Sequence, residues 1–136
     1  MAGPSRPFTE RDTLHMLNGC PVYLGVLQSS SSSSAVNNNN TATPFWNGST
    51  PPTTLAGKTL LIQPDANGCL LPLNVTTGAL ANAAQAVQTQ STSNVNPGLL
   101  VTNGTSLTLI MLPTAGFLSW VSAGAGAANL YVWELR

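Results

Sequence analysis

Charged side chains are nearly absent from this sequence. Its 136 residues include four Lys or Arg and four Asp or Glu, so charged residues make up 6% and the formal net charge is zero. Globular proteins carry charge on about a quarter of their residues. Residues 13–57 and 66–133 contain no acidic or basic side chain. Asn, Ser, Thr, Gln and backbone must therefore cover the surface. A free monomer with so little repulsion is expected to associate, the alternative being a neutral but stable monomer.

The scarcity of charge argues against two classes of partner. Nucleic-acid binding needs clustered Lys and Arg, whereas the four basic residues here are scattered among four acidic ones. A membrane-spanning helix needs about 20 apolar residues. The longest candidate, 107–121, is shorter and is interrupted by Pro113 and Gly116. Residues 1–20 show no basic start followed by an apolar stretch, so no secretion signal is recognisable. We expect neither nucleic acid nor membrane as a partner.

Residues suited to catalysis are also few. His15 is the only histidine, and its position between two apolar residues is typical of a structural role. It could otherwise pair with Cys20 as a base with a nucleophile. A metal site needs three or four suitably spaced ligands, and Asp12, His15 and Cys20 form only a loose cluster. We therefore predict no catalytic residue and no metal.

Two further patterns give no cofactor or redox site. The segment 57–59, Gly-Lys-Thr, resembles the end of a phosphate-binding loop, but Pro52 occupies the position of that motif's first glycine. We predict no cofactor. The two cysteines, Cys20 and Cys69, can be free thiols or a disulfide, because sequence does not reveal the distance between them. Free thiols are the simpler interpretation.

Short apolar segments separated by turn residues predict an all-β fold. Their spacing favours an antiparallel β-sandwich or a jelly-roll-like barrel. In the last segment, Leu130 and Val132 alternate with Tyr131 and Trp133, so both faces look buried and a central position in a sheet is expected. Strands are expected over residues 21–28, 58–63, 69–75, 99–102, 105–112, 117–122 and 129–135.

The residues between these segments predict how the strands connect. Asp65 opens an Asp-Ala-Asn-Gly sequence over 65–68, the chemistry of a type I turn, which predicts a hairpin. Asn103-Gly104 and the segment 113–116 predict two more linked hairpins. Pro64 and Pro72 each remove a backbone donor, so their strands are expected at a sheet edge or to break at the proline.

The chain divides into an arm and one β domain. Residues 1–20 are expected to form an extended N-terminal arm or a short helical turn, and 21–136 a single domain. Residues 29–54 are a polar insertion after the first strand, with six consecutive serines and four consecutive asparagines, typical of a flexible loop. Phe8 in the arm and Phe45-Trp46 in the loop are apolar anchors. We predict that these three aromatic residues contact neighbouring subunits.

The three tryptophans allow two interpretations. Trp46, Trp120 and Trp133 could stack on sugar rings while Asn and Thr bind the hydroxyls, as in a carbohydrate-binding β-sandwich. Alternatively, Trp120 and Trp133 belong to the core and Trp46 anchors an interface. We favour the second interpretation, because both later tryptophans lie in apolar strands.

Composition and two segments resemble a known group of proteins. The uncharged Asn/Ser/Thr/Ala/Gly-rich β chain, with Leu-Ala-Gly-Lys-Thr-Leu-Leu-Ile-Gln-Pro over 55–64 and Asn-Leu-Tyr-Val-Trp-Glu-Leu-Arg over 129–136, resembles small virion proteins of tailed bacteriophages, especially capsid decoration or cement proteins. The likeness covers residues 55–136 and transfers no catalytic residues. The long Ser/Asn loop departs from it.

The resemblance implies a β-sandwich or jelly roll that binds across capsomers and stabilises the head. Its partners would be the major capsid protein or other virion subunits, in a homo-oligomer located in the virion and assembled in the host cytoplasm. Residues 1–54 would reach neighbouring subunits. We therefore predict a non-enzymatic virion structural protein. The alternatives are a carbohydrate-binding or adhesin-type module, a tail or connector component, and an enzyme acting through His15.

Overall fold

The computed structural model describes residues 20–38, 44–46, 55–73, 87–111 and 116–136. No described residue is helical, which confirms the all-β prediction. The described part contains no helix long and apolar enough to cross a bilayer. The strands are β1 (Pro21–Ser29), β2 (Val36–Asn37), β3 (Pro44–Trp46), β4 (Thr59–Pro64), β5 (Gly68–Leu73), β6 (Leu99–Val101), β7 (Leu107–Ile110), β8 (Phe117–Ser122) and β9 (Ala128–Leu135).

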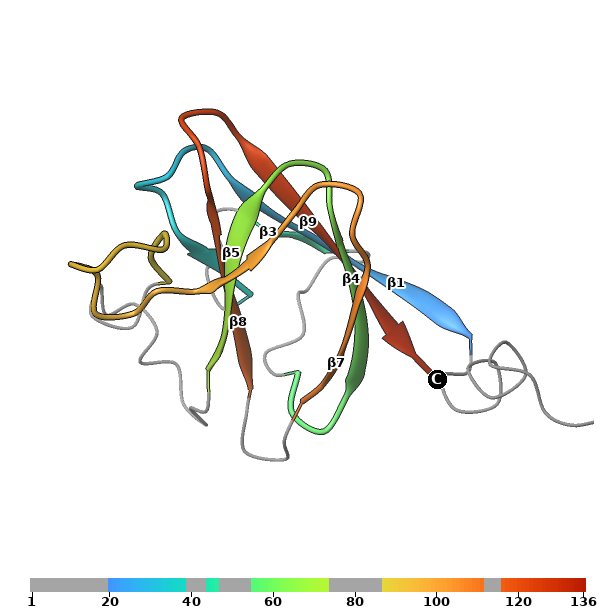
Figure 1. Cartoon of the computed structure of the whole chain (residues 1–136). Helices are drawn as coiled ribbons and strands as arrows, with labels where there is room; N and C mark the ends of the chain where they lie inside the picture. Colours follow the sequence, from blue (N-terminus) through green and yellow to red (C-terminus); the bar gives the residue numbers. More distant parts are fainter. Residues whose placement is uncertain (1–19, 39–43, 47–54, 74–86, 112–115) are drawn as a thin grey trace, which may run out of the picture.

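The strands form two antiparallel sheets that pack face to face (Figure 1). A five-stranded sheet has the order β3-β1-β9-β4-β7, and a four-stranded sheet has the order β2-β8-β5-β6. This arrangement is a β-sandwich. The segment 29–54, predicted to be a polar loop, supplies one short strand to each sheet, β2 and β3. As expected, β9 lies in the centre of its sheet, between β1 and β4.

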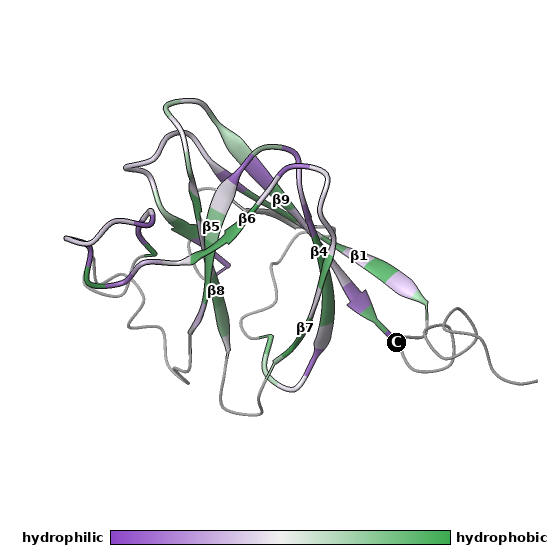
Figure 2. Cartoon of the chain, viewed as in Figure 1, coloured by the Kyte–Doolittle hydropathy of each residue, from purple (hydrophilic) through white to green (hydrophobic). Residues whose placement is uncertain are grey.

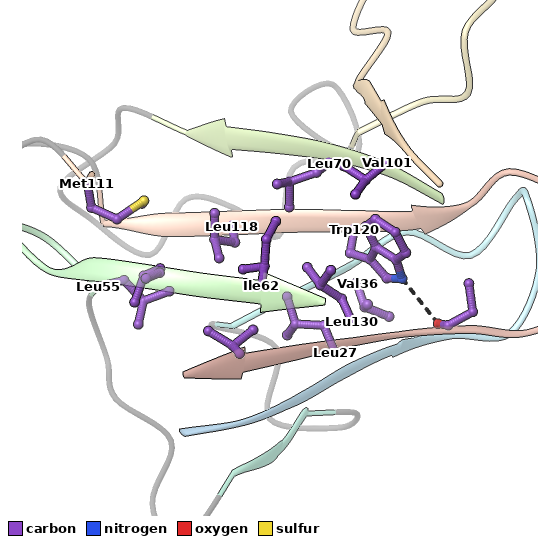
Figure 3. Close-up of a cluster of buried hydrophobic side chains, with 13 residues drawn as sticks. Leu27, Val36, Leu55, Ile62, Leu70, Val101, Met111, Leu118, Trp120 and Leu130 are labelled. Carbon is purple, nitrogen blue, oxygen red and sulfur yellow. Dashed lines mark hydrogen bonds between the residues drawn. The ribbon is translucent and has the colours of Figure 1, made fainter. Parts of the chain in front are cut away.

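One hydrophobic core fills the space between the sheets (Figure 3). Strand alternation explains its composition, because inward residues of β4 and β9 such as Ile62 and Val132 are completely buried while their neighbours are not. Trp120 of β8 is also completely buried, which confirms its predicted core position. Its indole nitrogen donates a hydrogen bond of 3.1 Å to the Ala128 carbonyl, so the one polar atom of this large side chain is satisfied.

Every residue of β8 is buried, because both of its faces are covered. Its inward residues meet the core. On the outer face, Val121 packs in a smaller cluster with Cys69 and Val87, and Ala35 and Leu71 border that cluster. Figure 2 shows hydrophobic colour along β5, β6 and β8, whereas the chain over 88–97 beside them is largely hydrophilic.

The predicted hairpins are wrong. The turn at 65–68 joins β4 to β5, but these strands belong to different sheets. Strand β6 pairs with β5 rather than with β7, and β7 pairs with β4 rather than with β8. The connections after β4, β6 and β8 cross from one sheet to the other at the same end of the sandwich, at the top of Figure 1. Turn residues favour a chain reversal, but they do not select the sheet to which the next strand belongs.

The two prolines are accommodated without placing their strands at an edge. Strands β4 and β5 are both internal, so that alternative is wrong. Pro64 is the last residue of β4 and lies beyond the part that pairs with β7, which ends at Ile62. Pro72 lies beyond the part of β5 that pairs with β6, which ends at Leu70. Each proline therefore lies where its strand has a partner on only one side, a position that tolerates proline better than one paired on both sides.

Candidate functional site

The predicted interface residues are only partly placed. Phe8, like His15, lies outside the described residues. Phe45 and Trp46 belong to β3, the edge strand of the five-stranded sheet, where they pair with Val26 and Gly25 of β1. Their side chains lie outside the described part. Contact between these aromatic residues and neighbouring subunits therefore stays a prediction.

A cluster of three aromatic side chains, called here the aromatic cluster, lies on the outer face of the five-stranded sheet. It consists of Tyr23 of β1 with Trp133 and Tyr131 of β9. The Tyr23 and Trp133 rings are 5.6 Å apart between centroids and tilted by 58°, and the Tyr131 and Trp133 rings are 6.3 Å apart and tilted by 37°. Tyr23 is 37% exposed, and the other two are half-buried. The expected core position of Trp133 is wrong, since this residue lies on the face opposite the core.

A β-bulge in β1 positions Tyr23 in the aromatic cluster. Tyr23 pairs with Trp133 and Gly25 pairs with the adjacent Val132, so the residue between Tyr23 and Gly25 has no partner of its own. This extra residue, Leu24, packs against the core. Gly25 has φ 154°, a backbone conformation that residues with a side chain rarely adopt. A bulge re-aims the side chains next to it.

Both apolar and neutral polar side chains border the aromatic cluster, and Trp133 itself pairs with Leu61. Gln63 of β4 is exposed and pairs with Tyr131, and Gln28 of β1 is exposed on the same face. Burial, and then the neighbouring Tyr131, raises the pKa of Tyr23, so its phenol stays protonated. The aromatic cluster therefore lies among uncharged side chains, some apolar and some polar.

The charged groups of the described residues lie at strand ends. Glu134, near the end of β9, accepts from Lys58 at 3.0 Å and from Arg136 at 2.9 Å. Burial raises the pKa of Glu134, but the hydrogen bonds from Arg136 and Lys58 outweigh burial, and the pKa lies below its ordinary value. At the other end, the Asp65 carboxylate accepts 2.8 and 2.7 Å hydrogen bonds from the backbone and side-chain nitrogens of Asn129.

At the same end of the sandwich, hydrogen bonds join the three connections that cross between the sheets. The Asn67 side-chain oxygen accepts a 2.9 Å hydrogen bond from the Asn103 backbone, and its carbonyl accepts one of 2.9 Å from Ala123. A hollow of about 250 Å³ lies beside them, lined by Asn67, Ser122 and small residues of 123–127. The Asp65 carboxylate therefore fixes the start of β9 instead of closing the predicted hairpin.

Two edge strands are apolar and carry no charge. Strands β6 and β7 end the four-stranded and five-stranded sheets, respectively. Leu99 and Leu100 of β6 are 56% and 43% exposed, Ile110 of β7 is 78% exposed, and Val95 before β6 is 81% exposed. Edge strands of soluble proteins are commonly protected by Lys, Pro or inward charges. Neither strand contains such a residue.

No metal-binding cluster occurs among the described residues. They contain no group of three His, Cys, Asp or Glu close enough to hold an ion. Cys20 is exposed and Cys69 is buried, and both are free thiols, as the simpler interpretation expected. A neutral pocket of about 360 Å³ is lined by residues that include Ser32, Gln88 and Asn94. The amides of Gln88 and Asn94 already bond to the backbone at 3.0 and 2.6 Å.

Comparison with known proteins gives no relative: no family model, curated protein or solved structure matches the chain.

Proposed function

We propose that this chain is a non-enzymatic structural subunit of a tailed-phage virion, and that it stabilises the head by binding across capsomers. The observation that carries the proposal is the pair of apolar, uncharged edge strands, β6 and β7. The phage setting rests on the resemblance of residues 55–136 to decoration proteins.

Edge strands that contain no charge or proline favour association. An edge strand presents unpaired N–H and C=O groups that a strand of another chain can use. Around these groups, exposed Leu99, Leu100 and Ile110 add apolar surface that a partner would bury. Stable interfaces bury about 1,200–2,000 Å² in total. The two edges would contribute part of that area to an interface with the major capsid protein or with further copies of this chain.

The scarcity of charge predicts how such binding responds to salt. Screening weakens interactions between exposed charges. Since charged residues make up 6% of the sequence, an interface built on β6 and β7 changes little in affinity when salt is raised. This property distinguishes it from decoration by electrostatic attraction.

Co-sedimentation with phage heads that lack this protein tests the proposal. The full chain is expected to bind the heads saturably and to raise their resistance to heat or chelation. Leu100→Lys and Ile110→Lys are expected to lower the affinity at least tenfold. Ala125→Lys, in an exposed turn between β8 and β9, is the matched control and is expected to bind normally. A chain that stays monomeric at high concentration and leaves the heads unbound contradicts the proposal.

A further inference from the structure

We infer that Asn103 is a site of spontaneous deamidation, at which water converts the side-chain amide to a carboxylate without an enzyme. Asn103 and Gly104 form the turn between β6 and β7, the two edge strands. The product carries a new negative charge on a chain whose formal net charge is zero. The inference does not depend on the proposed function.

The reaction needs only a side-chain amide and the backbone nitrogen that follows it. The Gly104 nitrogen attacks Cγ of Asn103 and closes a five-membered succinimide, while the Cγ–Nδ2 bond breaks and ammonia leaves with the proton of the attacking N–H. Ring closure is favoured because both groups belong to one chain. Water then opens the ring, giving its hydroxyl to a carbonyl carbon and its proton to the nitrogen. Attack at Cγ yields aspartate, and attack at the backbone carbonyl carbon yields isoaspartate.

The folded turn leaves both reacting groups accessible. Asn103 and Gly104 are exposed, and among the described residues neither the Asn103 amide nor the Gly104 nitrogen takes part in a hydrogen bond. Gly104 has φ +80°, and nothing lies within 4 Å of a Cβ built there, so the peptide between the two residues has room to rotate. One backbone hydrogen bond of 3.1 Å, from Thr105 to Thr102, closes the turn.

A second Asn-Gly pair in the described part has the opposite surroundings. The peptide between Asn67 and Gly68 is fixed, because its carbonyl accepts a 2.9 Å hydrogen bond from Ala123 and Gly68 pairs with both β6 and β8. Gly68 is buried, and Trp120 packs on it. The Gly68 nitrogen therefore reaches the Asn67 side chain only after β5 opens locally. Core strands open far less often than exposed turns.

Incubation of the full chain in mildly alkaline buffer, followed by peptide mapping, tests the inference. Chymotrypsin separates the two pairs, because leucines bound the peptides 101–107 and 62–70. Digestion in heavy-oxygen water marks any amide lost during digestion itself. Mass spectrometry measures the conversion, and labelling by an isoaspartyl methyltransferase detects isoaspartate. Asn103 is expected to lose its amide at least about tenfold faster than Asn67, because only Asn67 requires opening of a core strand.

Two controls separate the fold from the local sequence. In guanidinium, which unfolds the chain, the two asparagines are expected to react at similar rates. Asn103→Gln keeps an amide but would have to close a six-membered ring, so it is expected to stop the conversion in peptide 101–107. The Asn-Gly pairs at 18–19 and 47–48 lie outside the described residues and are followed as separate peptides.

Three results overturn the inference. The first is an equal rate at Asn103 and Asn67 in the folded chain. The second is an Asn103 that reacts only after unfolding, which would mean that the turn protects it. The third is a rate ratio that stays the same in guanidinium, because the difference would then come from the neighbouring residues rather than from the fold.

Discussion

Replacing Gly68 with alanine would place a methyl group inside the space that Trp120 occupies. A Cβ built on Gly68 lies 2.7 Å from Cε2 of the indole, and closer still to Cζ2 and Cη2. The ring has little freedom to move, because it is completely buried and its nitrogen bonds to Ala128 at 3.1 Å. Gly68 also pairs with β6 and β8, so its backbone is held on both sides.

Three contributions set the size of the effect. Overpacking a well-packed core costs about 1–3 kcal/mol. Tilting the ring weakens its hydrogen bond, which contributes about 0.5–1.5 kcal/mol. Alanine in place of glycine restores about 0.4–1 kcal/mol by restricting the unfolded chain. The net expectation for Gly68→Ala is a loss of about 1–3 kcal/mol, a fall in Tm of roughly 3–10 °C.

Urea unfolding followed by tryptophan fluorescence and by circular dichroism measures this loss. Gly124→Ala and Gly126→Ala are the matched controls, because nothing lies within 4 Å of a Cβ at either position. Each is expected to change the free energy of unfolding by less than about 0.5 kcal/mol. Gly104→Ala isolates the backbone effect, since its φ is +80° and its surroundings are also open.

A double-mutant cycle identifies the contact responsible. In a Trp120→Leu background the indole is gone, so Gly68→Ala is expected to cost less there than in the parent chain. The coupling should be about 0.5–3 kcal/mol. If Gly68→Ala behaves like Gly124→Ala, or costs the same with and without the indole, then the packing of Trp120 on β5 is not as described.

The remaining predictions concern a buried amide and an ion pair. Asn38 is 1% exposed, and its side chain forms hydrogen bonds with two buried backbone groups. Asn38→Leu is therefore expected to lower the free energy of unfolding, measured in urea, by about 2–4 kcal/mol. Thr92→Leu, at an exposed position, is the control and should have little effect. Because Lys58 and Arg136 hold the pKa of Glu134 below its ordinary value, the charged carboxylate stabilises the fold above that value, and this contribution is lost as pH falls through the lowered pKa. The stability difference between the parent and Glu134→Gln should therefore be present at pH 7 and decrease progressively as the pH falls below the ordinary value of 4.5. A constant difference across that range contradicts the assignment.

Local sequence was sufficient to locate most strands. The expected segment 117–122 coincides with β8, and the segments 21–28 and 129–135 differ from β1 and β9 by one residue each. Alternation of apolar and polar residues has a period of two, so a few adjacent residues reveal it. The near absence of charge, and with it the uncharged edges, is likewise a property of composition.

Tertiary structure alone decided which strands pair and which aromatic residues meet. Residues 65–68 look like a hairpin turn, yet β4 and β5 lie in opposite sheets, where the inward faces of both contribute to one core. Tyr131 and Trp133 alternate with buried neighbours, but alternation does not tell an outer face from a second core. Tyr23 reaches Trp133 only through pairing of the first and last strands and the bulge at Gly25. Such contacts join residues far apart in the chain, and they depend on the burial of all strands together, which no short window of sequence contains.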